Sequence, residues 1–227
     1  MDSSIKVKKS TMVRPAKETP KGSLWLSKLD IIIRPPNSHT NVIHFYSPHK
    51  TSSKIFDVNI FEEALSKSLV SFYPMAGRLK FNNENERYEI DCNAKGVLFI
   101  EAESTKALAD FGDYLRLDSQ LRKVVFPKCD YSRGLSSFPL LLVQLTRFKC
   151  SSVCLGYAPH HHVADGSSNF HFLNSWARLA RGLDLNVYPV HDRATYLAPR
   201  NPPQVMFRHL EYEPSLPPFT TKGRLIR

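Results

Sequence analysis

The sequence has few cysteines and no long hydrophobic run. Four of its 227 residues are cysteine, and no two cysteines have the C-x-x-C spacing of many zinc and redox sites. Because no apolar leader opens the chain, we expect the thiols to be reduced and the protein to be cytoplasmic. No hydrophobic stretch approaches the ~20 residues that cross a bilayer, so we expect no membrane partner.

Clusters of basic residues are also lacking, although the chain is strongly basic. Its 31 Lys and Arg residues outnumber 21 Asp and Glu residues, which gives a formal net charge of +10. The basic residues are scattered, and no run exceeds two, as at Lys8-Lys9. The positive electrostatic field of a protein with this net charge attracts anions. A nucleic-acid partner would rest on this charge alone, so we expect none.

Hydrophobic residues make up 42% of the chain and aromatic residues 11%, which is typical of a globular protein with a sizeable core. Alternating and helical hydrophobic patterns are mixed along the chain, which predicts an α/β fold. Strands are expected at residues 5–13, 41–47, 88–92, 97–101, 138–145 and 153–158, and helices at residues 59–73, 105–114 and 167–181.

Two local patterns give more specific expectations. The run Ile31-Ile32-Ile33 suits a short buried strand. The sequence Asn93-Ala94-Lys95-Gly96 suits a turn that joins the strands at 88–92 and 97–101 into a hairpin.

Proline marks a change near the end of the chain. Seven of the 16 prolines lie between Pro189 and Pro218, where no hydrophobic period is visible. This composition is typical of a linker. We therefore predict a domain at residues 1–188 and a proline-rich crossover segment at residues 189–227.

Three consecutive histidines follow the strand at 153–158, and a helix follows them. Imidazole is the side chain whose ordinary pKa lies closest to neutral, so it is the usual proton acceptor in catalysis. Asp165 stands four residues after His161, where its carboxylate can orient the ring or the backbone of the turn. Gly166 is expected to permit a tight backbone there.

Other chemistries fit this stretch less well. His160, His162 and Asp165 are enough to ligate zinc, but no cysteine or further carboxylate completes a known spacing, so we expect no metal. Ser167 and Ser168 lack the G-x-S-x-G context of a catalytic serine.

The extended stretch His161-His162-Val163-Ala164-Asp165-Gly166 resembles the HXXXDG signature of the BAHD family of plant acyl-CoA-dependent acyltransferases. Three further stretches resemble its branch of hydroxycinnamoyl-CoA shikimate/quinate hydroxycinnamoyltransferases. These are LWLSKLD at 24–30, FYPMAGRL at 72–79 and FHFLNSWARLARG at 170–182.

This resemblance implies a fold, a reaction and roles for residues. The fold is a mixed β-sheet flanked by helices, a chloramphenicol-acetyltransferase-like domain that is the first of the family's two. The reaction moves a hydroxycinnamoyl group from a CoA thioester to an acceptor such as shikimate or quinate. His161 would be the general base for the acceptor's hydroxyl or amine, while Asp165, Gly166 and His162 would be structural. Acyl-CoA is a co-substrate, and no cofactor is permanently bound.

The resemblance also places an acyl pocket along the strand at 41–47. Relatives carry a hydroxyl residue and a Tyr or His there, and the matching residues are Val42 and His44, with Thr40 as a weaker candidate. An ordinary strand role for His44 stays open. His160 lies outside the signature, so its replacement is expected to have little effect.

Members of the family are roughly twice as long and carry a second signature, DFGWG, that does not occur here. The chain therefore resembles the N-terminal half, with the second domain absent. A separate polypeptide could supply the other half. The alternative is a truncated, non-catalytic half-protein that acts as an interaction module or is inactive.

Overall fold

The computed structural model describes residues 4–32, 35–47, 56–113, 119–204 and 206. Two compact units are distinguished, Met1–Leu197 and Ala198–Arg227. The described residues of the second unit form no helix or strand, and all elements below belong to the first. No helix among the described residues is long and apolar enough to cross a membrane.

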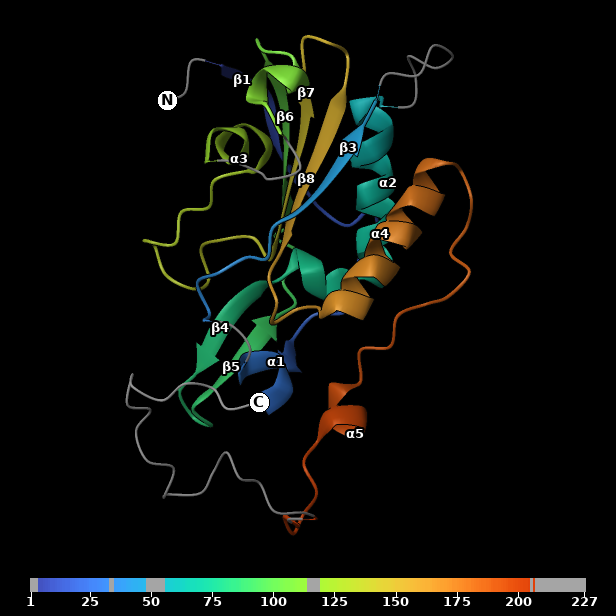
Figure 1. The fold of residues 1–227 in the computed structure, drawn as a ribbon. Helices are drawn as coiled ribbons and strands as arrows, with labels where there is room; N and C mark the ends of the chain where they lie inside the picture. Colours follow the sequence, from blue (N-terminus) through green and yellow to red (C-terminus); the bar gives the residue numbers. More distant parts are fainter. Residues whose placement is uncertain (1–3, 33–34, 48–55, 114–118, 205, 207–227) are drawn as a thin grey trace, which may run out of the picture. The chain divides into compact units, whose positions relative to one another are not determined.

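A five-stranded mixed sheet is the centre of the first unit, in the order β1-β6-β7-β8-β3 (Figure 1). Its strands are β1 (Ile5–Val13), β3 (Val42–Tyr46), β6 (Val97–Ser104), β7 (Leu141–Arg147) and β8 (Val153–Pro159). The pair β6 and β7 is parallel, and the other pairs are antiparallel. The expectation of a mixed sheet flanked by helices is confirmed.

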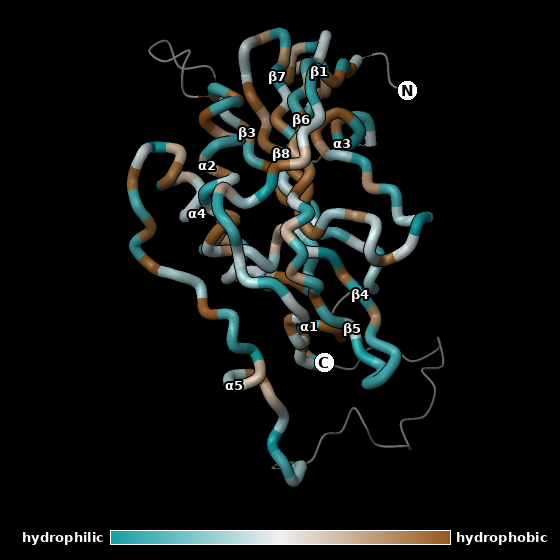
Figure 2. The backbone as a smooth tube through the Cα atoms, turned by 180° about the vertical axis from the view of Figure 1, so that it is seen from behind, coloured by the Kyte–Doolittle hydropathy of each residue, from teal (hydrophilic) through white to brown (hydrophobic). Residues whose placement is uncertain are grey.

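Strand β7 is buried along almost its whole length because it is the middle strand and is covered on both faces. Its polar Gln144 is satisfied by donating from Nε2 to the Val124 carbonyl at 2.6 Å. The hydrophobic stretches in Figure 2 run along β7 and its neighbour β8. A strand that is apolar on both faces was therefore the right expectation for this segment.

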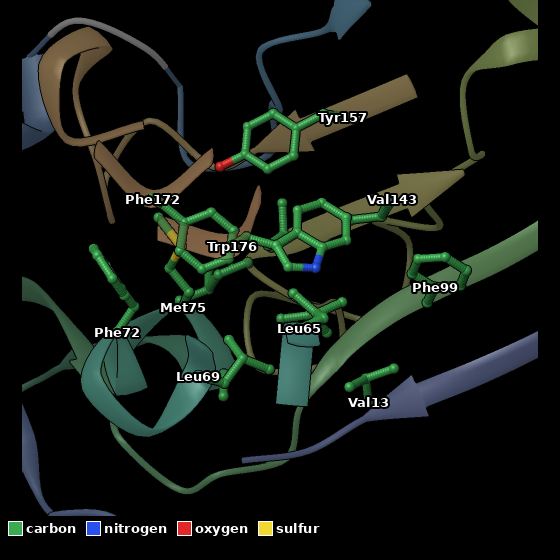
Figure 3. Packing of buried hydrophobic residues seen from close by; sticks show 14 of the residues in the cluster. Val13, Leu65, Leu69, Phe72, Met75, Phe99, Val143, Tyr157, Phe172 and Trp176 are labelled. Atoms are coloured by element: carbon green, nitrogen blue, oxygen red, sulfur yellow. The ribbon is translucent and has the colours of Figure 1, made fainter. Parts of the chain in front are cut away.

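Helices α2 (Val58–Ser71) and α4 (Gly166–Ala180) lie together on one face of the sheet, and α3 (Ser119–Val125) lies on the other (Figure 1). On the first face, Leu65 and Leu69 from α2 meet Phe172 and Trp176 from α4 (Figure 3). The Trp176 indole N–H also donates to the Phe61 carbonyl at 3.0 Å.

Glycine is needed in β8 where α3 crosses it. A Cβ at Gly156 would stand 2.0 Å from the Val125 carbonyl oxygen. The C-terminal end of α3 therefore lies directly on the strand that carries the histidines.

The expected hairpin of residues 88–101 is wrong. Strand β5 (Arg87–Asp91) pairs with β2 (Ser23–Trp25) and β4 (Arg78–Asn82) in a separate three-stranded sheet, whereas β6 belongs to the large sheet. The connection runs between the sheets because Cys92 N–H donates to Gly22 O and Gly96 N–H donates to Ala76 O. Gly96 has a φ of 93°, and a Cβ there would lie 2.4 Å from the Val13 carbonyl.

The short strand expected at 31–33 is also wrong, because residues Lys28–Ile32 form helix α1 and Ile32 is 76% exposed. Its start is fixed by reciprocal bonds. The Asp30 carboxylate accepts from both the backbone N–H and the hydroxyl of Ser27 at 2.8 Å, and Asp30 N–H donates to Ser27 Oγ. This is a capping box, which outweighs the β-branched run. Ile33 lies outside the described residues.

The remaining elements are short. The 3₁₀ turns η1 (Tyr73–Ala76) and η2 (Leu108–Phe111) follow α2 and β6, and η2 occupies part of the helix expected at 105–114. Tyr114 lies outside the described residues. Helix α5 (Arg193–Leu197) lies within the segment predicted as a crossover. The domain boundary at residue 188 stays a prediction.

Candidate active site

The histidine stretch forms the turn between β8 and α4. His160 N–H donates to the Leu140 carbonyl at 2.8 Å, which continues the pairing with β7 by one residue. Val163 N–H then donates to the His160 carbonyl at 3.0 Å, which closes a tight turn around His161 and His162. The three imidazoles consequently leave the turn in different environments.

His161 is the partly exposed histidine of the three, whereas His160 and His162 are fully buried. Its Nδ1 is buried and has no hydrogen-bond partner among the described residues. A ring nitrogen without a fixed hydrogen-bond partner is available to accept a proton. Because the ring is also partly exposed just after the end of a strand, a bound molecule could supply that proton.

Asp165 caps helix α4 instead of bonding to His161. Its Oδ1 accepts from the Ser168 backbone N–H at 2.8 Å. The bonds to Ser168, backbone first, lower the pKa of Asp165, and the nearby His161 and Arg193 lower it further. Within the described part of the chain, Asp165 makes no hydrogen bond to an imidazole. This geometry favours an orienting role in the turn over a relay, which would need the carboxylate on the ring nitrogen.

Gly166 does not have the backbone role expected for it. It is the first residue of α4, it is not among the glycines with positive φ, and a Cβ there would meet nothing within 4 Å. Because its conformation suits any residue, the tight-backbone argument is wrong. The structural role that the resemblance implies for Gly166 stays a prediction.

His162 is fully buried, and neither ring nitrogen has a hydrogen-bond partner among the described residues. Its ring meets Tyr88 of β5 edge to face at 6.0 Å and lies 4.8 Å from the His160 ring. Burial lowers the pKa of His162, against a smaller opposing effect of Asp30. The imidazole is therefore held neutral between the turn and the small sheet, which suits a structural role.

Strand β3 and the segment just before it place the three pocket candidates at different distances from the turn. Thr40 lies beside it, because its N–H donates to the Pro159 carbonyl at 2.9 Å. Val42 pairs with Tyr157, and His44 pairs with Leu155. Since Leu155 is four residues before Pro159, His44 lies about 13 Å back along the sheet. Its Nε2 is buried without a partner in the described chain.

Two residues outside the expected set also hold the turn. Arg193 donates from Nη2 to the Val163 carbonyl at 2.7 Å, and its Nε lies 3.5 Å from the Asp30 carboxylate. His39 forms an isolated bridge with His160. No local sequence pattern identifies either residue as part of the turn, because Arg193 is 30 positions from Val163 and His39 is 121 positions from His160.

Metal binding has no site among the residues that the structure describes. No group of three or more His, Cys, Asp or Glu side chains there is arranged to hold an ion. All four cysteines are free thiols.

Comparison with known proteins shows which family the chain belongs to. A family model described as the transferase family matches residues 3–224. The chain belongs to this family, the BAHD acyltransferases.

Curated relatives of this BAHD chain act on different acceptors. Anthranilate N-benzoyltransferase protein 1 of Dianthus caryophyllus is 57% identical over 222 residues, which cover 94% of this chain and 49% of that protein. The shikimate O-hydroxycinnamoyltransferase of Nicotiana tabacum is 51% identical over 210 residues, which cover 92% and 47%. The chain spans about half the length of the curated relatives it matches.

A solved structure is also matched over about half of its length. The crystal structure of vinorine synthase superimposes with a TM-score of 0.68 at 27% identity, covering 87% of this chain and 48% of that one. The fold is therefore that of one half of a BAHD acyltransferase.

Proposed function

We propose that this chain carries the catalytic base of an acyltransferase that moves an acyl group from a CoA thioester to a small acceptor. The observation that carries the proposal is the position of His161. Its ring is partly exposed after the end of β8, and its Nδ1 has no hydrogen-bond partner among the described residues, while the Asp165 carboxylate caps helix α4.

The proposed reaction is a direct transfer. The acceptor's O–H or N–H gives its proton to His161, and the freed electron pair forms a bond to the thioester carbonyl carbon. The C–S bond then breaks, and CoA leaves as a thiolate that takes the proton back. The stabilisation of the tetrahedral oxyanion belongs to groups outside the residues named here.

The proposed donor is a hydroxycinnamoyl-CoA, and the proposed acceptor is shikimate or quinate, as in the tobacco relative. A second candidate is transfer of a benzoyl group to the amine of anthranilate, the reaction named for the Dianthus relatives. The observation in its favour is Val42, which offers no hydroxyl at the position where hydroxycinnamoyl relatives are expected to carry one.

Thr40, Val42 and His44 form the proposed acyl-binding edge. Val42 and His44 stand at alternate positions of β3 and so share one face of the sheet, and Val42 packs against the core under α2 and α4. Thr40 lies nearest the turn and His44 furthest, so an acyl group bound along this edge would point its thioester toward His161.

An acyl-transfer assay tests the proposal. The 227-residue chain is incubated alone, and also with a separately produced second half of the tobacco relative. The donors are p-coumaroyl-CoA and benzoyl-CoA, and the acceptors are shikimate, quinate and anthranilate. We expect the chain alone to be inactive and the mixture to release CoA with at least one pair.

The assay separates three outcomes. Release of CoA that depends on His161 supports the proposal, and the preferred pair decides between the two acceptor classes. A mixture that binds the second half but transfers no acyl group would favour a non-catalytic interaction module. Transfer by the chain alone would show that one domain holds the whole site.

A further inference from the structure

Two histidines behind the candidate base, the partly buried His39 and the fully buried His160, form a reciprocal pair. His39, on the segment before β3, bonds through Nε2 to the Pro139 carbonyl at 2.9 Å, just before β7. His160, at the end of β8, bonds through Nε2 to the Pro36 carbonyl at 3.0 Å, on the segment that carries His39. Their rings meet edge to face, with centroids 5.1 Å apart.

These contacts fix the proton positions on both rings. A carbonyl oxygen can only accept a hydrogen bond, so Nε2 carries the proton in both residues and Nδ1 is the acceptor. The Nδ1 of His39 lies 2.7 Å from the Tyr131 hydroxyl, which therefore donates to it. The Nδ1 of His160 accepts from the backbone N–H of His162 at 3.3 Å.

The surroundings keep both rings neutral. Burial lowers the pKa of His39 to about 4 and that of His160 to about 3, against smaller opposing effects of the proline carbonyls. The charged forms of His39, His162 and His161 would repel a proton on His160 further. Phe138 stacks on the His160 ring at 5.8 Å, and Tyr131 packs against Phe138 at 5.0 Å.

The pair joins three segments that are distant in the sequence at the backbone of the catalytic turn. The bonds from Thr40 N–H to Pro159 O and from His160 N–H to Leu140 O run alongside it. The backbone N–H of His162 donates to His160 Nδ1, so the His160 ring contacts the residue directly after His161 at this amide. The orientation of the backbone at this amide sets where the His161 ring can lie.

We propose that His39 and His160 are a permanently neutral positioning pair, which fixes the turn of His161 through the hydrogen bond from His162 N–H to His160 Nδ1. The pair itself does not touch substrate. The proposal deepens the proposed function and rests on it, since the positioned ring is the candidate base. It also revises the expectation that His160 is dispensable.

The tautomers are tested first, on the unmodified 227-residue chain. Long-range ¹H–¹⁵N spectra of the histidine rings are recorded between about pH 5 and about pH 8, where an ordinary histidine titrates. We expect the His39 and His160 rings to show the neutral Nε2–H pattern throughout. A His160 ring that titrates in this range, or that carries its proton on Nδ1, would overturn the proposal without any variant.

Amide exchange tests the contact with the turn. In His160→Ala the His162 amide should exchange roughly fivefold faster, the factor expected for the loss of one net hydrogen bond. His160→Asn keeps an oxygen acceptor at the place of Nδ1 and should restore most of the protection. His171→Ala, on α4 and outside the cluster, is the matched control and should leave this amide unchanged. Equal exchange in the Ala and Asn variants would reduce His160 to a packing residue.

Kinetics in the assembled enzyme supply the readout that packing alone would not move. His160→Ala should lower kcat on the order of tenfold with little change in KM for acyl-CoA, because a displaced base loses rate more than binding. His160→Asn should recover most of kcat, and equal kcat in the two variants would contradict the proposal. If the wild-type assembly transfers no acyl group, the proposed function fails, while the ring spectra and amide exchange still decide the positioning pair.

Discussion

Acidification should destabilise this protein before its carboxylates are protonated, because His39 and His160 fold as neutral rings. In the unfolded chain each ring has the ordinary histidine pKa of 6.5, whereas in the folded protein the values fall to about 4 and about 3. The unfolded state therefore binds more protons below pH 6.5. The stability due to the neutral rings is fully present above that pH and is lost as the pH falls toward the folded values.

The size of the effect follows from the two shifts. Each ring costs about 1.4 kcal/mol per pH unit once the unfolded histidine is protonated and the folded one is not. Between about pH 7.5 and about pH 5 this amounts to about 2 kcal/mol for each ring and about 4 kcal/mol together. Burial also lowers the pKa of His162 and His191, which adds loss in the same direction. A domain with only ~5–15 kcal/mol of stability would be strongly affected.

Urea unfolding measured across this pH range checks the prediction. The free energy of unfolding of the wild-type protein should fall by about 4 kcal/mol or more. In His160→Gln, which lacks the titrating ring, the free energy of unfolding should depend less steeply on pH, because about half of the pair's contribution is removed. The lowered pKa of Asp165 acts at lower pH and does not interfere. A wild-type protein whose stability is flat from neutral to about pH 5, or a variant with an unchanged slope, would refute the argument.

Three further outcomes follow from the packing and the site. Gly156→Ala should destabilise the protein by about 1–3 kcal/mol in urea unfolding, because the new Cβ would overlap the Val125 carbonyl that lies on β8. Trp176→Phe should cost about 1 kcal/mol or more in the same assay, since it removes the donor to the Phe61 carbonyl and part of the contact between α2 and α4. The purified chain should hold no stoichiometric zinc by elemental analysis, and a chelator should leave its melting temperature unchanged.

The sequence was sufficient where a hydrophobic period and a local stop signal agree. Strands β7 and β8 and the helix α4 were placed correctly because their apolar residues are continuous or periodic and their ends are marked by polar residues. The prediction that His161 is a site residue rests on the short signature around it, and the structure places this ring in the turn between β8 and α4. Both kinds of information lie within about twenty residues of chain.

The errors arose where a tertiary contact or a cap competes with a local pattern. Gly96 suits a hairpin turn. The backbone bonds from Cys92 to Gly22 and from Gly96 to Ala76 instead direct the chain from the small sheet to the large one. The isoleucines after Asp30 favour a strand, yet the Ser27 cap starts a helix.

The residues that support the turn between β8 and α4 could not be predicted for a related reason. His39 and Tyr131 are 92 positions apart, and each looks like an ordinary residue in its own segment. Only the pairing of β3 with β8 brings the segment of His39 to His160. The neutral tautomers depend on carbonyl positions that no sequence pattern encodes.

The central claim is that His161 is the base of an acyl transfer, and the most direct test is the turnover of His161→Ala in the assembled two-half enzyme. Replacing His161 should lower kcat on the order of 10²–10⁴-fold, which is the usual contribution of a positioned base. His171→Ala, which removes an imidazole from α4 outside the turn, should retain turnover close to wild type. An assembled His161→Ala enzyme that transfers the acyl group at the wild-type rate would contradict the assignment.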